Sequence, residues 1–234
     1  TEIGLKFDFQ DKNLRANIAA FSTEYLDMQV SAFVGASFVV SNAGASTIEG
    51  LEGDFEWSPL DGLYLGGAFT YLDFTFDKFI GGCTAAQDIA FRAANNNTVN
   101  TPMGPMTIFG TCSQDLKGQT GVNAPEMSSS LYAKYVINTG NGYDVVLGAD
   151  VNKIDEYFTQ NDLDPFNLSP DTTKVDLRVG LEADDNKWSL VVFGRNVTNE
   201  VGQSFGVDLP LISGSHVGYL QPGREIGMRY RVNF

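Results

Sequence analysis

A hydrophobic pattern with a period of two recurs along this chain and is its strongest structural constraint. In segment 175–182 apolar residues alternate with charged residues and glycine, and segments 143–152 and 225–234 show the same alternation. A period of two places apolar side chains on one face of a β-strand and polar side chains on the other. The pattern therefore predicts an all-β fold whose strands have two unlike faces, and it predicts no helix of any length.

Nine strands are predicted along the 234 residues. The alternation is regular in the last four of them. In the second and fourth strands its phase is ambiguous. In the fourth strand, Phe69 and Tyr71 fall on the opposite face from Leu72, Phe74 and Phe76, and a β-bulge would explain the change. The predicted strands lie near 2–9, 14–28, 38–57, 63–79, 120–137, 143–158, 171–183, 188–197 and 222–234.

The connections between these strands alternate strictly between short and long. A transmembrane β-barrel has short turns on its periplasmic side and long loops outside, whereas a soluble β-sandwich has no reason to collect its long loops at one end. The strands are also longer than the roughly 9–11 residues needed to cross a bilayer. We therefore expect an antiparallel transmembrane β-barrel. The short turns are 10–13, 58–62, 138–142 and 184–187, and the long loops are centred near 30–37, 80–118, 159–170 and 199–219.

Composition excludes several other classes of protein. The net charge of −14 argues against a nucleic-acid binder, which usually carries a basic stripe. Aromatic residues make up 12% of the chain, too many for a disordered segment. The charged fraction of 19% is low for a soluble protein. Strand faces that contact lipid would account for that low fraction.

The predicted topology implies that the barrel is not closed by this chain alone. Nine is an odd number, and a single-chain bacterial barrel has an even number of strands. An open strand edge in lipid would leave backbone groups without hydrogen bonds. We therefore expect either a C-terminal part of a larger barrel or a chain that partner chains complete.

The two cysteines, Cys83 and Cys112, both lie in the long polar loop 80–118. Because free thiols would be exposed there, the sequence predicts a disulfide and an oxidising compartment. The alternative is two unpaired small hydrophobic residues. His216 is the single histidine, so no zinc site is predicted, and no metal or cofactor is expected.

The C-terminal strand and several upstream segments carry a family resemblance. The terminal strand resembles the signal that the barrel assembly machinery recognises in outer-membrane proteins, with the residues Glu225, Gly227, Tyr230, Val232 and Phe234 at set offsets. Further segments, in their expected order, resemble the barrels of TonB-dependent receptors. They are 13–29, 42–44, 50–57, 115–118, 124–126, 188–200 and 222–224.

This resemblance implies a transport function in the bacterial outer membrane. TonB-dependent receptors are 22-stranded barrels with a plug in the lumen, and they import scarce ligands such as siderophores, cobalamin, haem or glycans. Residues 1–234 would form the C-terminal portion of such a barrel, strands 14–22, without the plug domain and the N-terminal strands. The implied partners are outer-membrane lipid, the remaining strands and plug or partner chains, the TonB system, and a small-molecule or glycan ligand.

No catalytic constellation is recognisable, so the chain is not expected to be an enzyme. Ligand contact is assigned weakly to Phe91, Phe109 and His216 in the long loops, with ordinary loop polarity as the alternative for the histidine. Segment 161–164 could offer oxygens to calcium, but a solvated turn is the simpler interpretation. Two other functions stay open: a structural or pore-forming barrel component, and an outer-membrane adhesin or assembly protein.

Charged residues on the polar strand faces are expected to point into the lumen. There they could contact a plug or line a passage, or they could simply be hydrated. Opposite charges on neighbouring strands could also form ion pairs. The residues concerned are Asp144, Asp150, Asp176, Arg178, Glu182, Arg229 and Arg231.

Overall fold

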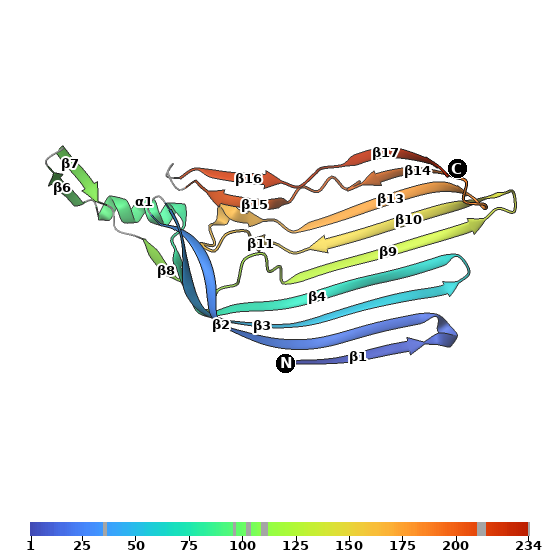
Figure 1. Ribbon diagram of the computed structural model, residues 1–234, viewed down its shortest axis with the longest axis horizontal. Coiled ribbons are helices and arrows are strands. Elements are labelled where there is room, and N and C mark those ends of the chain that lie inside the picture. The colour runs from blue at the N-terminus through green and yellow to red at the C-terminus, as the bar shows by residue number, and fades with distance from the viewer. Residues whose placement is uncertain (35–36, 96, 102–103, 109–111, 210–213, 234) are drawn as a thin grey trace.

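Nine strands form one antiparallel sheet in the computed structural model, and their order in the sheet follows the chain (Figure 1). The structure describes residues 1–34, 37–95, 97–101, 104–108, 112–209 and 214–233. The nine predicted strands are thereby confirmed. They are β1 (Glu2–Phe9), β2 (Leu14–Val34), β3 (Ser37–Leu60), β4 (Leu63–Lys78), β9 (Met127–Asn138), β10 (Tyr143–Ile154), β13 (Thr172–Ala183), β14 (Trp188–Arg195) and β17 (Glu225–Val232).

The long connections all lie at one end of the sheet and the short turns at the other, as predicted (Figure 1). The turn between β1 and β2 is a single 3-10 turn, η1 (Gln10–Lys12). The long loops contain structure of their own. It comprises β5 (Ile80–Gly82), α1 (Ala85–Ala94), β6 (Asn97–Thr101), β7 (Gly104–Ile108), β8 (Ser113–Asp115), β11 (Tyr157–Phe158), η2 (Pro165–Asn167), β12 (Leu168–Ser169), β15 (Gln203–Asp208) and β16 (His216–Leu220).

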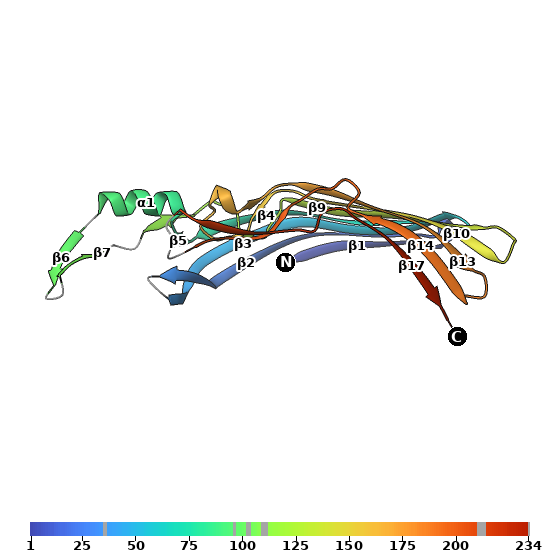
Figure 2. The same cartoon turned by 90° about the horizontal axis from the view of Figure 1, so that it is seen from above.

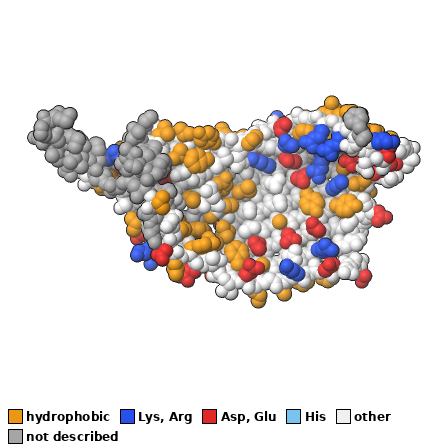
Figure 3. All heavy atoms as spheres, viewed as in Figure 1, with side chains coloured by type: hydrophobic (Ala, Val, Ile, Leu, Met, Phe, Trp, Pro, Cys, Tyr) orange, Lys and Arg blue, Asp and Glu red, His pale blue; other side chains and the backbone are white. Residues whose placement is uncertain are grey.

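The sheet is curved, so that its two faces differ in shape as well as in chemistry (Figure 2). On the convex face, Val179 of β13 stands opposite Leu147 on one neighbour and Val192 on the other. Arg178, one residue away, lies on the concave face instead. Figure 3 views the concave face and shows Lys and Arg side chains gathered over β13, β14 and β17. This arrangement confirms the predicted strand faces.

Glycines on the concave face make room for aromatic rings from the adjacent strand. A Cβ atom built on Gly66 would lie 2.4 Å from the ring of Tyr132, and one built on Gly227 would lie 2.6 Å from the ring of Phe193. Each ring therefore lies flat over a position that only glycine leaves open. These close approaches account for part of the chain's high glycine content of 25 residues.

The helix α1 contradicts the prediction of a helix-free chain. It starts with a capping box, in which the Thr84 hydroxyl accepts a hydrogen bond from the Gln87 N–H and the Gln87 side chain accepts one from the Thr84 N–H. An ion pair of 2.6 Å between Asp88 and Arg92 spans one turn. Local capping, the Asp88–Arg92 pair and several alanines favour this helix. In the described part of the chain, no helix is both long and apolar enough to span a membrane.

The predicted bulge in the fourth strand is also wrong. β4 keeps one register against β3 from Leu65 to Phe76, so Leu72 and Phe74 lie on the concave face. They are apolar because that end of the face is covered, with Phe76, Phe79 and Leu116 forming a buried cluster. Register shifts occur elsewhere: near both ends of the β3–β4 pairing, at Ala45/Ser46 and Trp57/Leu60. They also occur in β2, between Tyr25 and Met28 and between Met28 and Gln29, and β2 is the other strand whose phase is ambiguous in the sequence.

Some predicted strand ends differ from the observed ones. β2 and β3 extend to Val34 and Ser37, so the segment expected to be a long loop near 30–37 is mostly a hairpin, with 35–36 outside the described residues. β9 begins at Met127 rather than near 120. Each difference falls where a strand leaves the nine-stranded sheet.

Asn196 follows the loop end of β14, and its side chain forms hydrogen bonds to two of the segments that carried the family resemblance. Its side chain is buried and donates hydrogen bonds to the carbonyl oxygens of Glu200 and Pro222 at 2.7 and 3.2 Å. Its Oδ1 accepts from the N–H of Glu200 at 2.9 Å. One amide side chain therefore satisfies backbone groups of both 188–200 and 222–224.

We expect Asn196→Ala to destabilise the loop end of β14 and β17 by roughly 2–4 kcal/mol, because buried backbone groups lose their partners. The measurement is amide hydrogen exchange on the folded receptor, with faster exchange expected at the loop ends of both strands. Asn186→Ala is the matched control, since Asn186 shares the left-handed backbone conformation (φ 57° against 46°) in an exposed turn. Equal exchange in the two variants would contradict this assignment.

Candidate functional site

The concave face carries ion pairs between neighbouring strands, as predicted. Arg178 donates a hydrogen bond from Nη1 to Asp150 at 2.9 Å, and its side chain crosses Gly148, where a Cβ would lie 2.2 Å from Nε. Arg195 pairs with Glu225 at 3.2 Å. The predicted lumen residues share this face in the sheet register: Asp144, Asp150, Asp176, Arg178, Glu182, Arg229 and Arg231.

The charges on this face are divided between its two halves. Arg195 and Arg229 lie with their guanidinium carbons 5.0 and 6.0 Å from the ring centre of Phe193, in the half formed by β13, β14 and β17. In the other half, every second residue of the β3 segment 52–56 is acidic and faces the same side. The side chain of Asn17 donates hydrogen bonds to both carboxylate oxygens of Asp54. A plug or ligand inside the curve would therefore meet arginines interspersed with carboxylates over β13, β14 and β17, and a row of carboxylates over β3.

Three long loops combine into one platform over the loop end of the sheet. The loop after β4 bonds to the next loop, since Gln114 donates to the Asp162 carbonyl at 2.7 Å and the Ala85 N–H donates to Asp164 Oδ2 at 3.0 Å. The loop that follows β14 joins them, because the Gly206 N–H donates to the Thr159 hydroxyl at 3.0 Å. Among the described residues, buried polar side chains concentrate in segment 159–172. Polar bonds therefore hold the platform together, beside the small apolar cluster of Phe76, Phe79 and Leu116, against which Leu163 packs.

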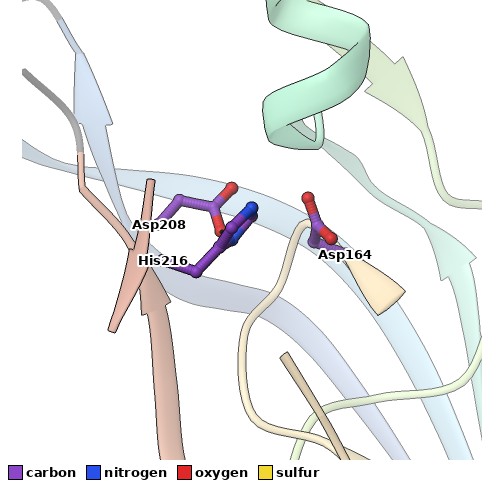
Figure 4. A group of neighbouring side chains, drawn as sticks. All are labelled: Asp164, Asp208 and His216. Carbon is purple, nitrogen blue, oxygen red and sulfur yellow. Dashed lines mark hydrogen bonds and ion pairs between the residues drawn. The ribbon is translucent and has the colours of Figure 1, made fainter. Parts of the chain in front are cut away.

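At the centre of the platform, Asp164, Asp208 and His216 face one another (Figure 4). Each offers one donor atom, and these atoms lie within 4.8 Å of one another. Asp208 Oδ1 lies 2.7 Å from His216 Nδ1. The ring of His216 stacks on Phe166 at 4.4 Å, which fixes the imidazole plane. The three side chains come from η2's N-cap position, from β15 and from β16.

A further carboxylate and an amide adjoin this group. Burial is the main cause that raises the pKa of Asp162 to about 7, the Asp164 N–H opposes the shift, and the nearby Asp208 carboxylate adds to it. Asn167 is fully buried and donates from Nδ2 to Asp208 at 2.9 Å. Its Oδ1 has no hydrogen-bond partner. The site thus concentrates negative charge in a partly desolvated position.

The remaining predicted site residues lie outside this group. Phe91 lies half-buried on α1, and Phe109 lies outside the described residues. Cys83 and Cys112 form the predicted disulfide, with their Cα atoms 5.6 Å apart. The terminal-strand residues Glu225, Gly227, Tyr230 and Val232 belong to β17, and Phe234 is outside the described part.

Sequence reasoning named His216 and segment 161–164 separately but did not connect them. Asp208 was not identified at all. The three side chains are separated by 44 and 8 residues, and no spacing pattern joins them. Only the pairing of β15 with β16, which places Asp208 opposite His216, brings the last two together.

The disulfide closes a segment of 29 residues and should restrict it. The chain-entropy relation gives at most about 3.6 kcal/mol for a loop of this length. We expect the double variant Cys83→Ser, Cys112→Ser to be cleaved faster by trypsin after Arg92, which lies inside the loop, while the sheet stays folded. Ser113→Ala, an exposed neighbour, is the control. Cleavage of both variants at the wild-type rate would show that the disulfide does not restrict the loop.

Comparisons with known proteins agree with this architecture. A family profile described as TonB dependent receptor-like, beta-barrel, matches residues 1–197. No curated protein matches the chain. Among solved structures, the ferric yersiniabactin uptake receptor FyuA from Yersinia pestis superposes with a TM-score of 0.72 and 16% identity, over 100% of this chain and 29% of that receptor.

Two further receptors show the same relation. The siderophore receptor PiuA from Acinetobacter baumannii gives a TM-score of 0.65 and 19% identity, over 98% of this chain and 27% of PiuA. The copper transporter OprC gives 0.61 and 12% identity, over 100% of this chain and 30% of OprC. The chain thus spans less than a third of the length of these receptors. Because the family profile covers most of its residues, the chain belongs to the TonB-dependent receptor β-barrel family of the Gram-negative outer membrane.

Proposed function

We propose that this chain forms part of the barrel of a TonB-dependent transporter that imports a scarce ligand. The observation that carries the proposal is the sheet itself, with an apolar convex face, a charged concave face and all long loops at one end. This combination suits a wall between lipid and a plugged lumen. A transport function also agrees with the family, whose members are receptors rather than enzymes.

The edge strands support a larger barrel. In the described residues, β1 pairs only with β2 and β17 only with β14, so each has one edge without a strand. Backbone groups in hydrocarbon need hydrogen-bond partners. We propose that residues 1–234 form the C-terminal portion of a 22-stranded barrel and that preceding strands of the same receptor close it. Partner chains are the alternative, and the mass of the native polypeptide distinguishes the two.

An iron chelate is the ligand class with the most support. FyuA is named for ferric yersiniabactin and PiuA for a siderophore, whereas OprC is named for copper. At identities below 20% these names do not transfer to this chain, so the ligand class is part of the proposal. The divided concave face would contact the plug, and the platform of loops would contact the ligand, with Phe91, Phe109 and His216 as candidate contacts.

We also propose an assembly role for the last strand. Its convex-facing residues Ile226, Met228 and Tyr230 are among the most exposed apolar side chains of the described chain, at 74, 70 and 64%. An edge strand with this pattern is suited to pair with an assembly template. The signal residues would be Glu225, Gly227, Tyr230, Val232 and Phe234.

The transport proposal is tested with the complete receptor in a strain that lacks it. We expect the receptor to restore uptake of radiolabelled ferric siderophores under iron limitation, and we expect uptake to disappear when TonB is deleted. Copper and cobalamin uptake are measured in parallel. Uptake of none of these ligands, or uptake that persists without TonB, would contradict the proposal.

A charge on the convex face should prevent assembly of the barrel. We expect Val179→Arg to cost roughly 2–4 kcal/mol, because the side chain would enter the middle of the bilayer. Val179 is 55% exposed on the convex face. Ala68→Arg is the control, because Ala68 lies exposed on the concave face opposite Asp54. The measurement is the folded fraction by heat-modifiable gel mobility; equal fractions would place the convex face outside lipid.

A further inference from the structure

The group formed by Asp164, Asp208 and His216 has the composition and spacing of a metal site. Its donors come from two different loops, and all lie within 4.8 Å of one another. Donor atoms around tetrahedral zinc stand about 3.4 Å apart, which follows from bond lengths near 2.1 Å. Closing the group around an ion would therefore need movement of at most about 1.4 Å.

The group also lacks a cationic partner. Asp164 is 2% exposed, and the side chain of Asp208 is 22% exposed. Within the described part of the chain, the histidine is the only basic side chain that lies within ion-pair distance of either carboxylate; no Lys or Arg does so. Asp162 lies beside them, and its Oδ1 accepts a hydrogen bond from the Asp164 N–H at 3.2 Å. Charges this close and this desolvated favour a cation among them.

The buried amide of Asn167 adjoins the group. Nδ2 donates a hydrogen bond to Asp208 Oδ1 at 2.9 Å, and the side chain has zero exposure. Its Oδ1, on the other side of the amide, has no hydrogen-bond partner. The Asp208 carboxylate is therefore held by a neutral amide donor and by the His216 ring, and neither supplies a permanent positive charge.

We propose that Asp164, Asp208 and His216 bind a divalent transition-metal ion that fastens two loops of the platform to each other. An imidazole nitrogen with two carboxylates suits Zn²⁺ or a similar ion, whereas Ca²⁺ and Mg²⁺ take oxygen ligands only. Asn167 or Asp162 would supply the next oxygen. The ion is a fixed part of the platform, and the inference does not depend on which ligand the barrel transports.

Binding would stabilise a part of the fold that has little apolar support. The Asp208 and His216 segments connect to the sheet through β15 and β16, a pair separate from the nine main strands. The Asp164 segment joins α1 through the Ala85 N–H. One ion at this point would therefore connect the three long loops.

The test uses the complete receptor, purified in detergent and stripped with a chelator. Zn²⁺ binding is measured by calorimetry and by metal analysis after dialysis. We expect about one Zn²⁺ ion per receptor, and we expect His216→Gln and Asp208→Asn each to weaken binding by at least about 10-fold. Asp171→Asn, an exposed aspartate in the same loop region, is the matched control and should bind as the wild type does.

Further measurements separate metal binding from folding of the barrel and from transport. Heat-modifiable gel mobility reports whether each variant is a folded barrel, and siderophore uptake is recorded separately. Zn²⁺ should slow proteolysis within the loop 199–219 of the wild type and of Asp171→Asn, and not of His216→Gln. Absence of Zn²⁺ binding in the wild type, wild-type affinity in folded His216→Gln, or binding of Ca²⁺ in preference to Zn²⁺ would each overturn the proposal. Absence of Zn²⁺ binding in the wild type would mean that the His216–Asp208 pair holds these segments together without a metal ion.

Discussion

The need to pair every backbone N–H and C=O group in hydrocarbon is the constraint on which this structure depends. The nine-stranded sheet meets it along its interior, where each strand bonds to two neighbours. The pairing fixes the register, and the register decides which face each side chain occupies, since a shift of one residue would exchange the faces. Positions such as Gly66 and Gly227 keep that register compatible with aromatic rings lying across the neighbouring strand.

The register also explains why the sign of charge can vary across the concave face while the two-residue alternation of polar and apolar side chains stays the same. On β13 and β14 the positions facing inward include Arg178 and Arg195, and on β3 they include Glu52 and Asp54. Alternation specifies only that these residues are polar, so their sign is free to vary along the sheet. The concave wall can therefore carry basic and acidic side chains in different proportions along the sheet. The convex face is apolar over most of the sheet and becomes polar toward the loop end, where Glu49 stands opposite Asp73.

Most of the sheet could be predicted from sequence because its determinants are local: a period of two, tight turns and long loops on alternate sides. The errors lie where that period stops being the governing signal. The helix α1 depends on the capping box of Thr84 and Gln87, which has no periodicity to detect. The phase change in β4 reflects tertiary covering by Phe79 and Leu116, and not a bulge. The disulfide of Cys83 and Cys112 was predictable because both residues share one loop.

The platform of loops follows a different rule from the sheet, and this is why its central group could not be predicted. Few of its apolar side chains are buried among the described residues, and its segments are positioned by polar bonds such as Thr159 to Gly206 and Asn167 to Asp208. Such bonds join residues about 40 positions apart and leave no spacing pattern in the sequence. A loop assembly held this way concentrates carboxylates without the basic partners that a soluble core would provide. Its stability then depends on what neutralises Asp164 and Asp208, and His216 is the basic side chain of that group.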